Sequence, residues 1–231
     1  MHITQAKLNR TNFSYNLSGN SLNVMNESKY LGVTIQSNLK WKSHVLNVSV
    51  KANCILSLLR RNLRSAPKAI RELSYISLVR PVLEYACPVW CPWLTQDINQ
   101  LEKVQRRAAR FVADNYSPYA SVSKIIDDLQ WTSLEQRRYQ LQLCLFYKMI
   151  HRYASANLDP FSLHQTPSRP HTRSVRSLQF QSSIPRTDIF KFSFCPRVIR
   201  HWNNLPEEVI SSTNLTDFKS SLNNLIVNLY H

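Results

Sequence analysis

The sequence predicts a mainly α-helical protein: a small N-terminal β-hairpin or strand element, a helical bundle, a Pro-rich irregular stretch and a final helix. Three observations favour this fold class. Hydrophobic residues make up 43% of the 231 residues, enough for the chain to bury a core. Apolar residues alternate only near the N-terminus, and from Trp41 onward they recur every three or four positions. Five prolines interrupt the helical pattern over 155–200.

The N-terminal residues 12–36 are expected to form strands. Aromatic and apolar side chains alternate with polar ones over 13–17, up to the turn sequence Ser18-Gly19-Asn20. The short β-branched run over 30–35 predicts a further strand. Within that strand, Gly32 is expected to mark a bulge or a close approach of another backbone.

A first helix is predicted from Trp41 to about Arg61. Its expected core stripe is Trp41, Val45, Val48, Ala52, Ile55 and Leu59. Pro67 suits the first position of a second helix, which Pro81 is expected to kink or end. The side chains predicted to point inward from this second helix are Ile70, Leu73, Ile76 and Val79. With two prolines, residues 87–93 are predicted to be a connector.

The third helix is expected to run from a cap at Thr95 or Asp97 through Phe111. A shorter helix follows over 122–129. The sequence Thr132-Ser133-Leu134-Glu135 then predicts a capping box.

That capping box is expected to start a long helix that runs to about His151. The long helix is apolar nearly all round, so we expect it at the centre of the bundle. The final helix is predicted over 216–229. Its apolar face is Phe218, Leu222, Leu225, Ile226 and Leu229.

These elements predict a chain of four parts. A β element occupies 1–40 and a helical domain 41–152; a Pro-rich basic linker or extended segment follows at 153–200, and a C-terminal segment with the last helix at 201–231. Residues 169–200 of the linker contain seven Lys and Arg but one acidic residue. Such a segment is expected to be extended when it has no partner.

Positive charge is the strongest compositional signal. Lys and Arg number 29 against 14 Asp and Glu, which gives a formal net charge of +15. This balance favours a polyanionic partner, either nucleic acid or an acidic membrane surface, and the clustering of the cations on helix faces favours nucleic acid. The alternative is a soluble protein that happens to be basic.

Several compartments and functions are excluded. The first ten residues hold no apolar run, and no stretch is long and apolar enough to span a bilayer, so we expect a cytoplasmic or nuclear protein without a membrane partner. The five cysteines are then expected to stay reduced. Because the chain has only two glycines, Gly-rich phosphate loops and dinucleotide fingerprints are excluded, and no small-molecule substrate is expected.

Two basic surfaces are the candidate binding sites. On the third helix, four cations lie opposite the apolar stripe, at a spacing that suits backbone phosphates. These are Lys103, Arg106, Arg107 and Arg110. A second set surrounds the first helix: Lys40, Lys42, Lys51, Arg60, Arg61 and Arg64. The alternative is that both surfaces are ordinary solvated helix faces.

No catalytic or metal-binding constellation is predicted. The pair Asp127-Asp128 lies in a helical pattern without the hairpin turn that a two-metal polymerase site needs, so solvated carboxylates at a helix end are expected. Cys87 and Cys91 lack two further ligands at workable spacing for zinc, and the tryptophans beside them indicate aromatic packing. His44 is expected to be a packed or surface residue rather than a base.

Five stretches, together with single residues between them, resemble one known family in its own order. They are Lys29–Ile35, Leu78–Ala86, Ile98–Phe111, Leu129–Trp131 and Trp202–Pro206. They resemble the segment that follows the catalytic site in reverse transcriptases of non-LTR retrotransposons, especially the jockey-like group of LINE elements. The resemblance covers roughly residues 1–210.

The resemblance implies a role for each part. Leu31 and Gly32 would belong to the end of the palm and help to place the primer terminus. Residues 41–152 would be thumb-like and grip an RNA/DNA template–primer duplex by its backbone. The family's palm and fingers, with the Asp-Asp site for Mg²⁺, would lie upstream of Met1. The expectation is therefore a truncated fragment, a partner of the missing palm and fingers, which is not an enzyme and holds no cofactor because the Mg²⁺ ligands are absent. The alternative is a helical protein-interaction or structural module without a nucleic-acid role.

Overall fold

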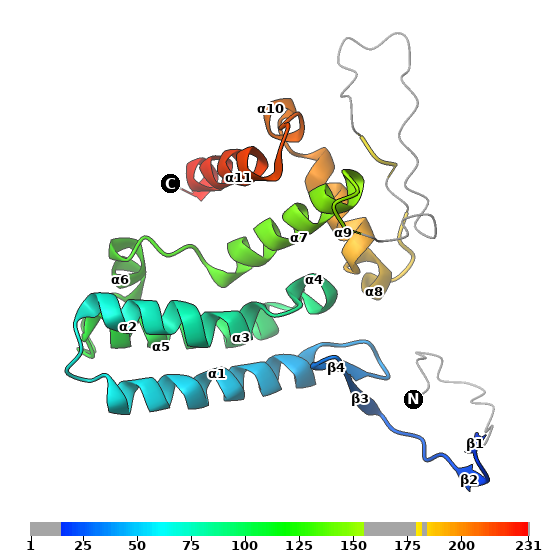
Figure 1. The fold of residues 1–231 in the computed structure, drawn as a ribbon, viewed down its shortest axis with the longest axis horizontal. Helices are drawn as coiled ribbons and strands as arrows, with labels where there is room; N and C mark the ends of the chain where they lie inside the picture. The colour runs from blue at the N-terminus through cyan, green and yellow to red at the C-terminus, as the bar shows by residue number, and fades with distance from the viewer. Residues whose placement is uncertain (1–14, 155–178, 182–183, 231) are drawn as a thin grey trace. The chain divides into compact units, whose positions relative to one another are not determined.

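The computed structural model of the chain describes residues 15–154, 179–181 and 184–230 (Figure 1). These residues are mainly helical, with two small antiparallel hairpins ahead of the helices, so the predicted fold class is confirmed. Phe13 and most of the predicted Pro-rich linker lie outside the described residues. Among the described helices, none combines the length and the hydropathy needed to cross a lipid bilayer.

The chain forms two compact units, which interleave along the sequence. Unit 1 consists of Met1–Ala86 and Pro92–Ile125, and unit 2 of Cys87–Cys91 and Ile126–His231. The helical part predicted over 41–152 therefore contributes to both units. Each unit is described separately.

Unit 1 starts with two hairpins. In the first, β1 (Asn16–Leu17) pairs with β2 (Asn20–Ser21), as predicted around the glycine turn. In the second, β3 (Glu27–Tyr30) pairs with β4 (Val33–Gln36). The prediction of one strand over 30–35 is wrong at its centre, because Leu31 and Gly32 form the two-residue turn of this hairpin. Both have positive φ, 45° and 84°, as the tight turns that match strand twist require.

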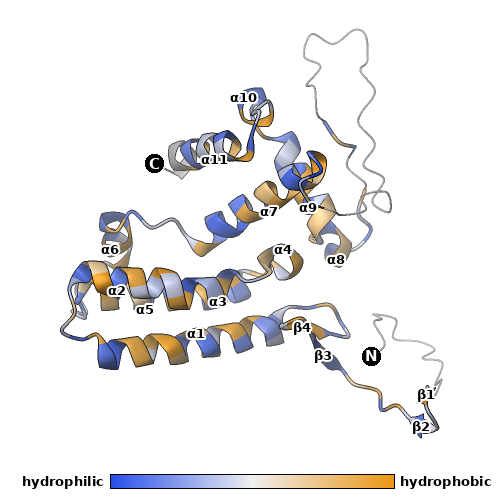
Figure 2. Cartoon of the chain, viewed as in Figure 1, coloured by the Kyte–Doolittle hydropathy of each residue, from blue (hydrophilic) through white to orange (hydrophobic). Residues whose placement is uncertain are grey.

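The helical part of unit 1 packs α1 (Lys42–Asn62) against the helical segment 68–84 and against α5 (Thr95–Ala113). Figure 2 shows hydrophobic and hydrophilic residues alternating along α1, as expected for a helix with one buried face. Val45, Ala52 and Leu59 of the predicted stripe are buried. The short α6 (Val122–Asp128) follows α5.

The helical segment 68–84 is continuous through Pro81. It consists of α2 (Lys68–Ser74), the π-helical turn η1 (Tyr75–Val79) and α3 (Arg80–Glu84). A proline ring clashes with the carbonyl four residues earlier in an α-helix. The wider π turn just before Pro81 carries an Arg80 N–H to Tyr75 O bond, five residues back, and makes room for the ring.

The inward face predicted for this helix is wrong in its first half. Ile70 and Leu73 are 46% and 59% exposed, whereas Arg71 and Tyr75 are buried. The buried residues are Arg71, Tyr75 and Val79, each four positions after the one before. Four residues complete one turn here because the π turn has more residues per turn than an α-helix. Only the last residue of the predicted stripe, Val79, is fully buried.

Two further boundaries differ from the predictions. The predicted connector 87–93 contains a short helix, α4 (Cys87–Trp90), whose two end residues are buried in unit 2. Neither Thr95 nor Asp97 caps α5, because the helix starts at Thr95 after an extended Leu94. Asp97 instead lies in the first turn, where the positive end of the helix dipole stabilises a carboxylate.

Unit 2 is built around α7 (Leu134–Ile150), as its apolar sequence predicts. Its capping box is one residue later than predicted. The Ser133 hydroxyl accepts from Gln136 N–H at 3.1 Å, and the Gln136 side chain accepts from Ser133 N–H at 2.9 Å. Trp90 and Trp202 are completely buried in this unit, so the predicted aromatic packing beside the cysteines is confirmed for Trp90.

Four helices follow in the described C-terminal part of unit 2. They are α8 (Asp188–Lys191), α9 (Phe194–Asn203), α10 (Glu207–Ile210) and α11 (Leu215–Tyr230). Of these, α9 and α11 pack directly on α7. The irregular stretch predicted up to residue 200 is therefore helical from Asp188. Pro196 is compatible with α9 because it lies in the first turn, where no N–H is needed for the helix. In α11, Phe218, Leu222 and Ile226 are buried as predicted.

Candidate nucleic-acid interface

The pairing of α1 with α5 sets the geometry of the basic surface. Arg107 donates from Nη1 to Asn53 Oδ1 at 3.0 Å, and the Arg60 guanidinium carbon lies 5.0 Å from the centre of the Tyr116 ring, just beyond α5. Arg60 follows Asn53 along α1, and its partner Tyr116 follows Arg107 along α5 and the loop after it, so the two helices run parallel. Their C-terminal ends consequently lie side by side.

At these ends the surface is hollowed into a groove, which we call the arginine groove. Its main hollow, of about 1000 Å³, is lined by Ser57, Arg60, Arg61, Arg64, Arg71, Phe111, Asp114 and Tyr116. A neighbouring hollow shares Ser57, Arg60 and Arg61 and adds Arg107 and Cys54. The two hollows thus form one continuous concave surface within unit 1.

The groove is strongly cationic. Five arginines line it, and Asp114 is the one carboxylate among its lining residues. Asp114 forms an ion pair with Arg71, Oδ1 to Nη1 at 3.4 Å. Arg71 is only 9% exposed, so its charge lies in the floor of the groove, whereas Arg60, Arg61 and Arg64 are exposed at the walls. A concave surface with this excess of positive charge attracts polyanions.

The structure divides the cations predicted on α5. Lys103 and Arg106 are exposed on the face opposite the buried Leu101, Val104 and Ala108, as predicted. Arg107 lies in the groove. Arg110 is half-buried and donates from Nη1 to Ser117 O at 3.0 Å, so it anchors the following loop.

The cations predicted around α1 do not form one patch. Arg60, Arg61 and Arg64 share the groove at its C-terminal end. Lys40 and Lys42 are exposed at the N-terminal end, and 18 residues from Lys42 to Arg60 span about 27 Å of helix. Lys51 is also exposed and lines a separate pocket beside the second hairpin.

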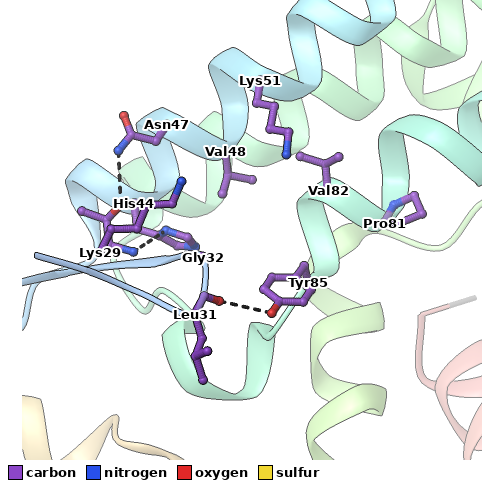
Figure 3. A pocket seen from close by; sticks show the side chains of 11 residues that line it. Lys29, Leu31, Gly32, His44, Asn47, Val48, Lys51, Pro81, Val82 and Tyr85 are labelled. Carbon is purple, nitrogen blue, oxygen red and sulfur yellow. Dashed lines mark hydrogen bonds between the residues drawn. The ribbon is translucent and has the colours of Figure 1, made fainter.

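That second pocket, of about 620 Å³, surrounds the Leu31-Gly32 turn (Figure 3). The Tyr85 hydroxyl, from just after α3, donates to Leu31 O at 3.2 Å. A Cβ atom on Gly32 would lie 3.3 Å from Tyr85 Cε1. The bulge or close backbone approach predicted at Gly32 is therefore wrong, because Gly32 lies in the hairpin turn and its near neighbour is a side chain.

His44 lies at the back of this pocket as a packed residue. Its Nδ1 accepts a hydrogen bond from Thr34 N–H at 3.1 Å (Figure 3). Burial, and secondarily the charge of Lys29, lowers the pKa of His44 to about 4. The ring is consequently neutral at physiological pH and serves to join β4 to α1. Of the two predicted states, a packed or a surface residue, the packed one is confirmed.

Arg71, Asp114 and Tyr116 were missed by the sequence analysis. Arg71 lies four residues before Tyr75 and eight before Val79, and this spacing could have shown that it shares their buried face. Asp114 has a φ of 53°, a left-handed conformation that ends α5. No local signal relates Tyr116 to Arg60, because their contact depends on the pairing of α1 with α5.

The candidate metal ligands stay apart. Among the residues that the structure describes, no group of three or more His, Cys, Asp and Glu side chains could hold a metal ion. Asp127 and Asp128 are exposed at the end of α6, as predicted. Cys91 accepts a hydrogen bond from Gln142 Nε2 at 3.3 Å, within the packing of α4 on α7.

Comparison of the chain with known protein families, with curated proteins and with solved structures finds no match.

Proposed function

We propose that unit 1 binds nucleic acid by its phosphate backbone, as the palm-end and thumb segment of a LINE-type reverse transcriptase would. The observation that carries the proposal is the convergence of five arginines on one groove that contains a single carboxylate. Guanidinium groups form two parallel hydrogen bonds to a phosphate and stay charged at every physiological pH. Contacts of this kind hold a strand without reading its sequence.

The family role rests on the resemblance described above, and two local features support it. Leu31 and Gly32 form an ordered turn that Tyr85 holds against the end of α3. Lys29 and Lys51 lie in the same pocket, where their charges suit the backbone of a strand end. Placing a primer terminus is the role we propose for this turn, and gripping the duplex the role we propose for the arginine groove.

The test measures binding of a labelled RNA–DNA hybrid duplex by fluorescence anisotropy over a range of salt concentrations. For the full chain, we expect the logarithm of affinity to fall linearly with the logarithm of salt concentration. The double variant Arg61→Gln/Arg64→Gln should bind more weakly and show a salt slope shallower by about 2, one for each lost phosphate contact. Both side chains are exposed, so the fold should be unaffected.

Arg186→Gln/Arg200→Gln is the matched control, since it removes the same net charge from exposed positions of unit 2. We expect this control to change the affinity for the duplex much less. Equal losses in the two double variants would show that only net charge matters, and the proposed groove would then be rejected.

A helical protein-interaction module is the second candidate. The exposure of Ile70, Leu73 and Leu78 on the helical segment 68–84 favours it, because exposed apolar side chains on a helix suit a protein partner. Binding through that surface would be insensitive to salt and to the arginine variants. The same anisotropy series therefore separates the two candidates.

A further inference from the structure

The loop that follows α5 has two exposed aromatic rings, one of which, Tyr116, lines the arginine groove. Tyr116 is 48% exposed and Tyr119 is 96% exposed. An exposed tyrosine loses the favourable burial of its ring, so two of them in one short loop call for an explanation. Proteins that bind single strands combine such rings with a cationic groove, because every base has a face that can stack.

Several hydrogen bonds hold this loop in place. Asn115 N–H donates to Arg110 O at 3.1 Å, and Arg110 Nη1 donates to Ser117 O at 3.0 Å. Ser117 N–H donates to Asn115 Oδ1 at 3.2 Å, and Tyr119 N–H to Ser117 Oγ at 3.3 Å. The loop is therefore ordered before any ligand binds, which lowers the entropic cost of presenting its rings.

Tyr116 and Arg60 bring a ring and a cation together at the groove wall. The Arg60 guanidinium carbon lies 5.0 Å from the ring centre, yet nearly half of Tyr116 stays exposed. A base stacked on the exposed part of the ring would place its own phosphate near the arginines of the wall.

Arg71 supplies a second, independent observation. Its side chain is 10% exposed and forms one ion pair, with Asp114 through Nη1. Its Nε has no hydrogen-bond partner among the residues that the structure describes. A buried guanidinium donor without an acceptor is costly. Because Arg71 lines the main hollow, a phosphate in the groove would compensate the charge of this poorly satisfied guanidinium.

We propose that the arginine groove holds an unpaired nucleotide of a single-stranded RNA or DNA segment. Its base stacks on Tyr116, and its phosphate binds Arg71 together with Arg64. A base within a duplex is stacked on both faces and cannot use this ring, so the groove should favour a strand that runs beyond the duplex. The inference rests on the proposed function and deepens it, because it names the form of nucleic acid that the groove selects.

The test compares a labelled single-stranded RNA of about 12 nucleotides, within the usual range of site sizes, with a blunt RNA–DNA hybrid of the same length. In the full chain, Tyr116→Ala should weaken binding of the single strand by about fivefold or more, the loss of one stacked base. Binding of the blunt hybrid should change by less than about twofold, since it lacks that contact. Tyr116→Phe keeps the ring and should bind both probes as the unchanged chain does.

A second measurement does not depend on affinity. A single strand that carries 2-aminopurine should lose fluorescence on binding, because the base stacks on a tyrosine, and Tyr116→Ala should abolish that quenching. Thermal unfolding shows whether Tyr116→Ala is folded. If it is not, two observations decide the question: the full chain and Tyr116→Phe should both quench the 2-aminopurine of the single strand, and neither should quench 2-aminopurine placed in the blunt hybrid.

The outcomes separate the two proposals. If the chain binds the hybrid with a steep salt dependence, but Tyr116→Ala leaves single-strand binding and quenching unchanged, the inference is rejected and the proposed function stands. If Tyr116→Ala weakens both probes equally, the ring has no preference for unpaired bases, and the inference is likewise rejected. If neither probe binds, the proposed function fails as well.

Discussion

His44 shows how a single buried residue makes this fold sensitive to acid. Its Nδ1 accepts from Thr34 N–H, so the hydrogen bond needs the unprotonated nitrogen. Burial is the main cause that lowers the pKa of His44 from 6.5 to about 4, and Lys29 adds to it. Because the folded pKa lies below the unfolded one, this contribution to stability is complete above about pH 6.5 and is lost as the pH falls toward 4.

We therefore expect His44→Asn to be less acid-sensitive than the unchanged chain. The asparagine Oδ1 takes the position of the histidine Nδ1 and can still accept from Thr34 N–H, but the side chain does not titrate. Between pH 7 and pH 4.5 the free energy of unfolding should fall by about 2 kcal/mol more in the unchanged chain than in the variant. Urea unfolding at the two pH values measures this difference.

Some acid sensitivity should remain in the variant. Burial, then Arg197 and Arg200, lowers the pKa of His201 to about 4 as well. An identical fall in the two proteins would show that His44 is already free to take up a proton in the folded state.

At the level of secondary structure, the ends of the helices depend on particular side chains. α7 begins where Ser133 and Gln136 satisfy each other's backbone N–H groups. Its four first N–H groups would otherwise lack partners within the helix. α5 ends at Asp114, whose left-handed backbone closes the helix and whose carboxylate meets Arg71.

Ser133→Ala should lower the free energy of unfolding by about 1 kcal/mol, because the hydroxyl that caps α7 is lost. Ser133→Asp is the control that retains a capping oxygen, and it should stay close to the unchanged chain. Denaturant unfolding monitored by circular dichroism measures both. The capping assignment is wrong if alanine and aspartate at this position give the same stability.

On the scale of the whole molecule, charge and apolar exposure are unevenly distributed. Unit 1 carries most of the chain's net charge of +15, and its arginine groove has five arginines against one carboxylate. The same unit exposes Ile70 and Leu73 on α2, together with several apolar residues of the first hairpin. Exposed apolar surface of this kind favours association with itself or with another protein.

The double variant Ile70→Gln/Leu73→Gln should therefore keep its stability and associate less. We expect its free energy of unfolding to change by no more than about 0.5 kcal/mol, as at other exposed positions. Val79→Ala, at a completely buried position of the same helix, should cost about 2 kcal/mol. Sedimentation velocity at several concentrations measures the association. A loss of stability as large as that of Val79→Ala would show that the two side chains are buried after all.

The fold class, the positions of the long helices α1, α5, α7 and α11, and the polarity of the faces of α1 and α5 could be predicted from the sequence, whereas α4, α8, α9 and α10 could not. These features follow from the spacing of apolar residues within each helix, which does not depend on the neighbouring helices. The sequence also indicated the cations of both helices and that His44 is a packed or surface residue. The turn at Leu31 and Gly32 was less accessible, because a two-residue turn and a glycine within a strand look alike in an apolar run.

Helix packing, which the sequence does not reveal, brings some of the cations together and keeps others apart. Arg60, Arg61 and Arg64 meet Arg107 because α1 and α5 pack in parallel, and Arg71 joins them because the π turn before Pro81 sets the buried face of its helix. Lys40 and Lys42, equally basic in sequence, lie at the opposite end of α1. Contacts between residues some 50 positions apart depend on helix packing, which leaves no periodic trace in the sequence.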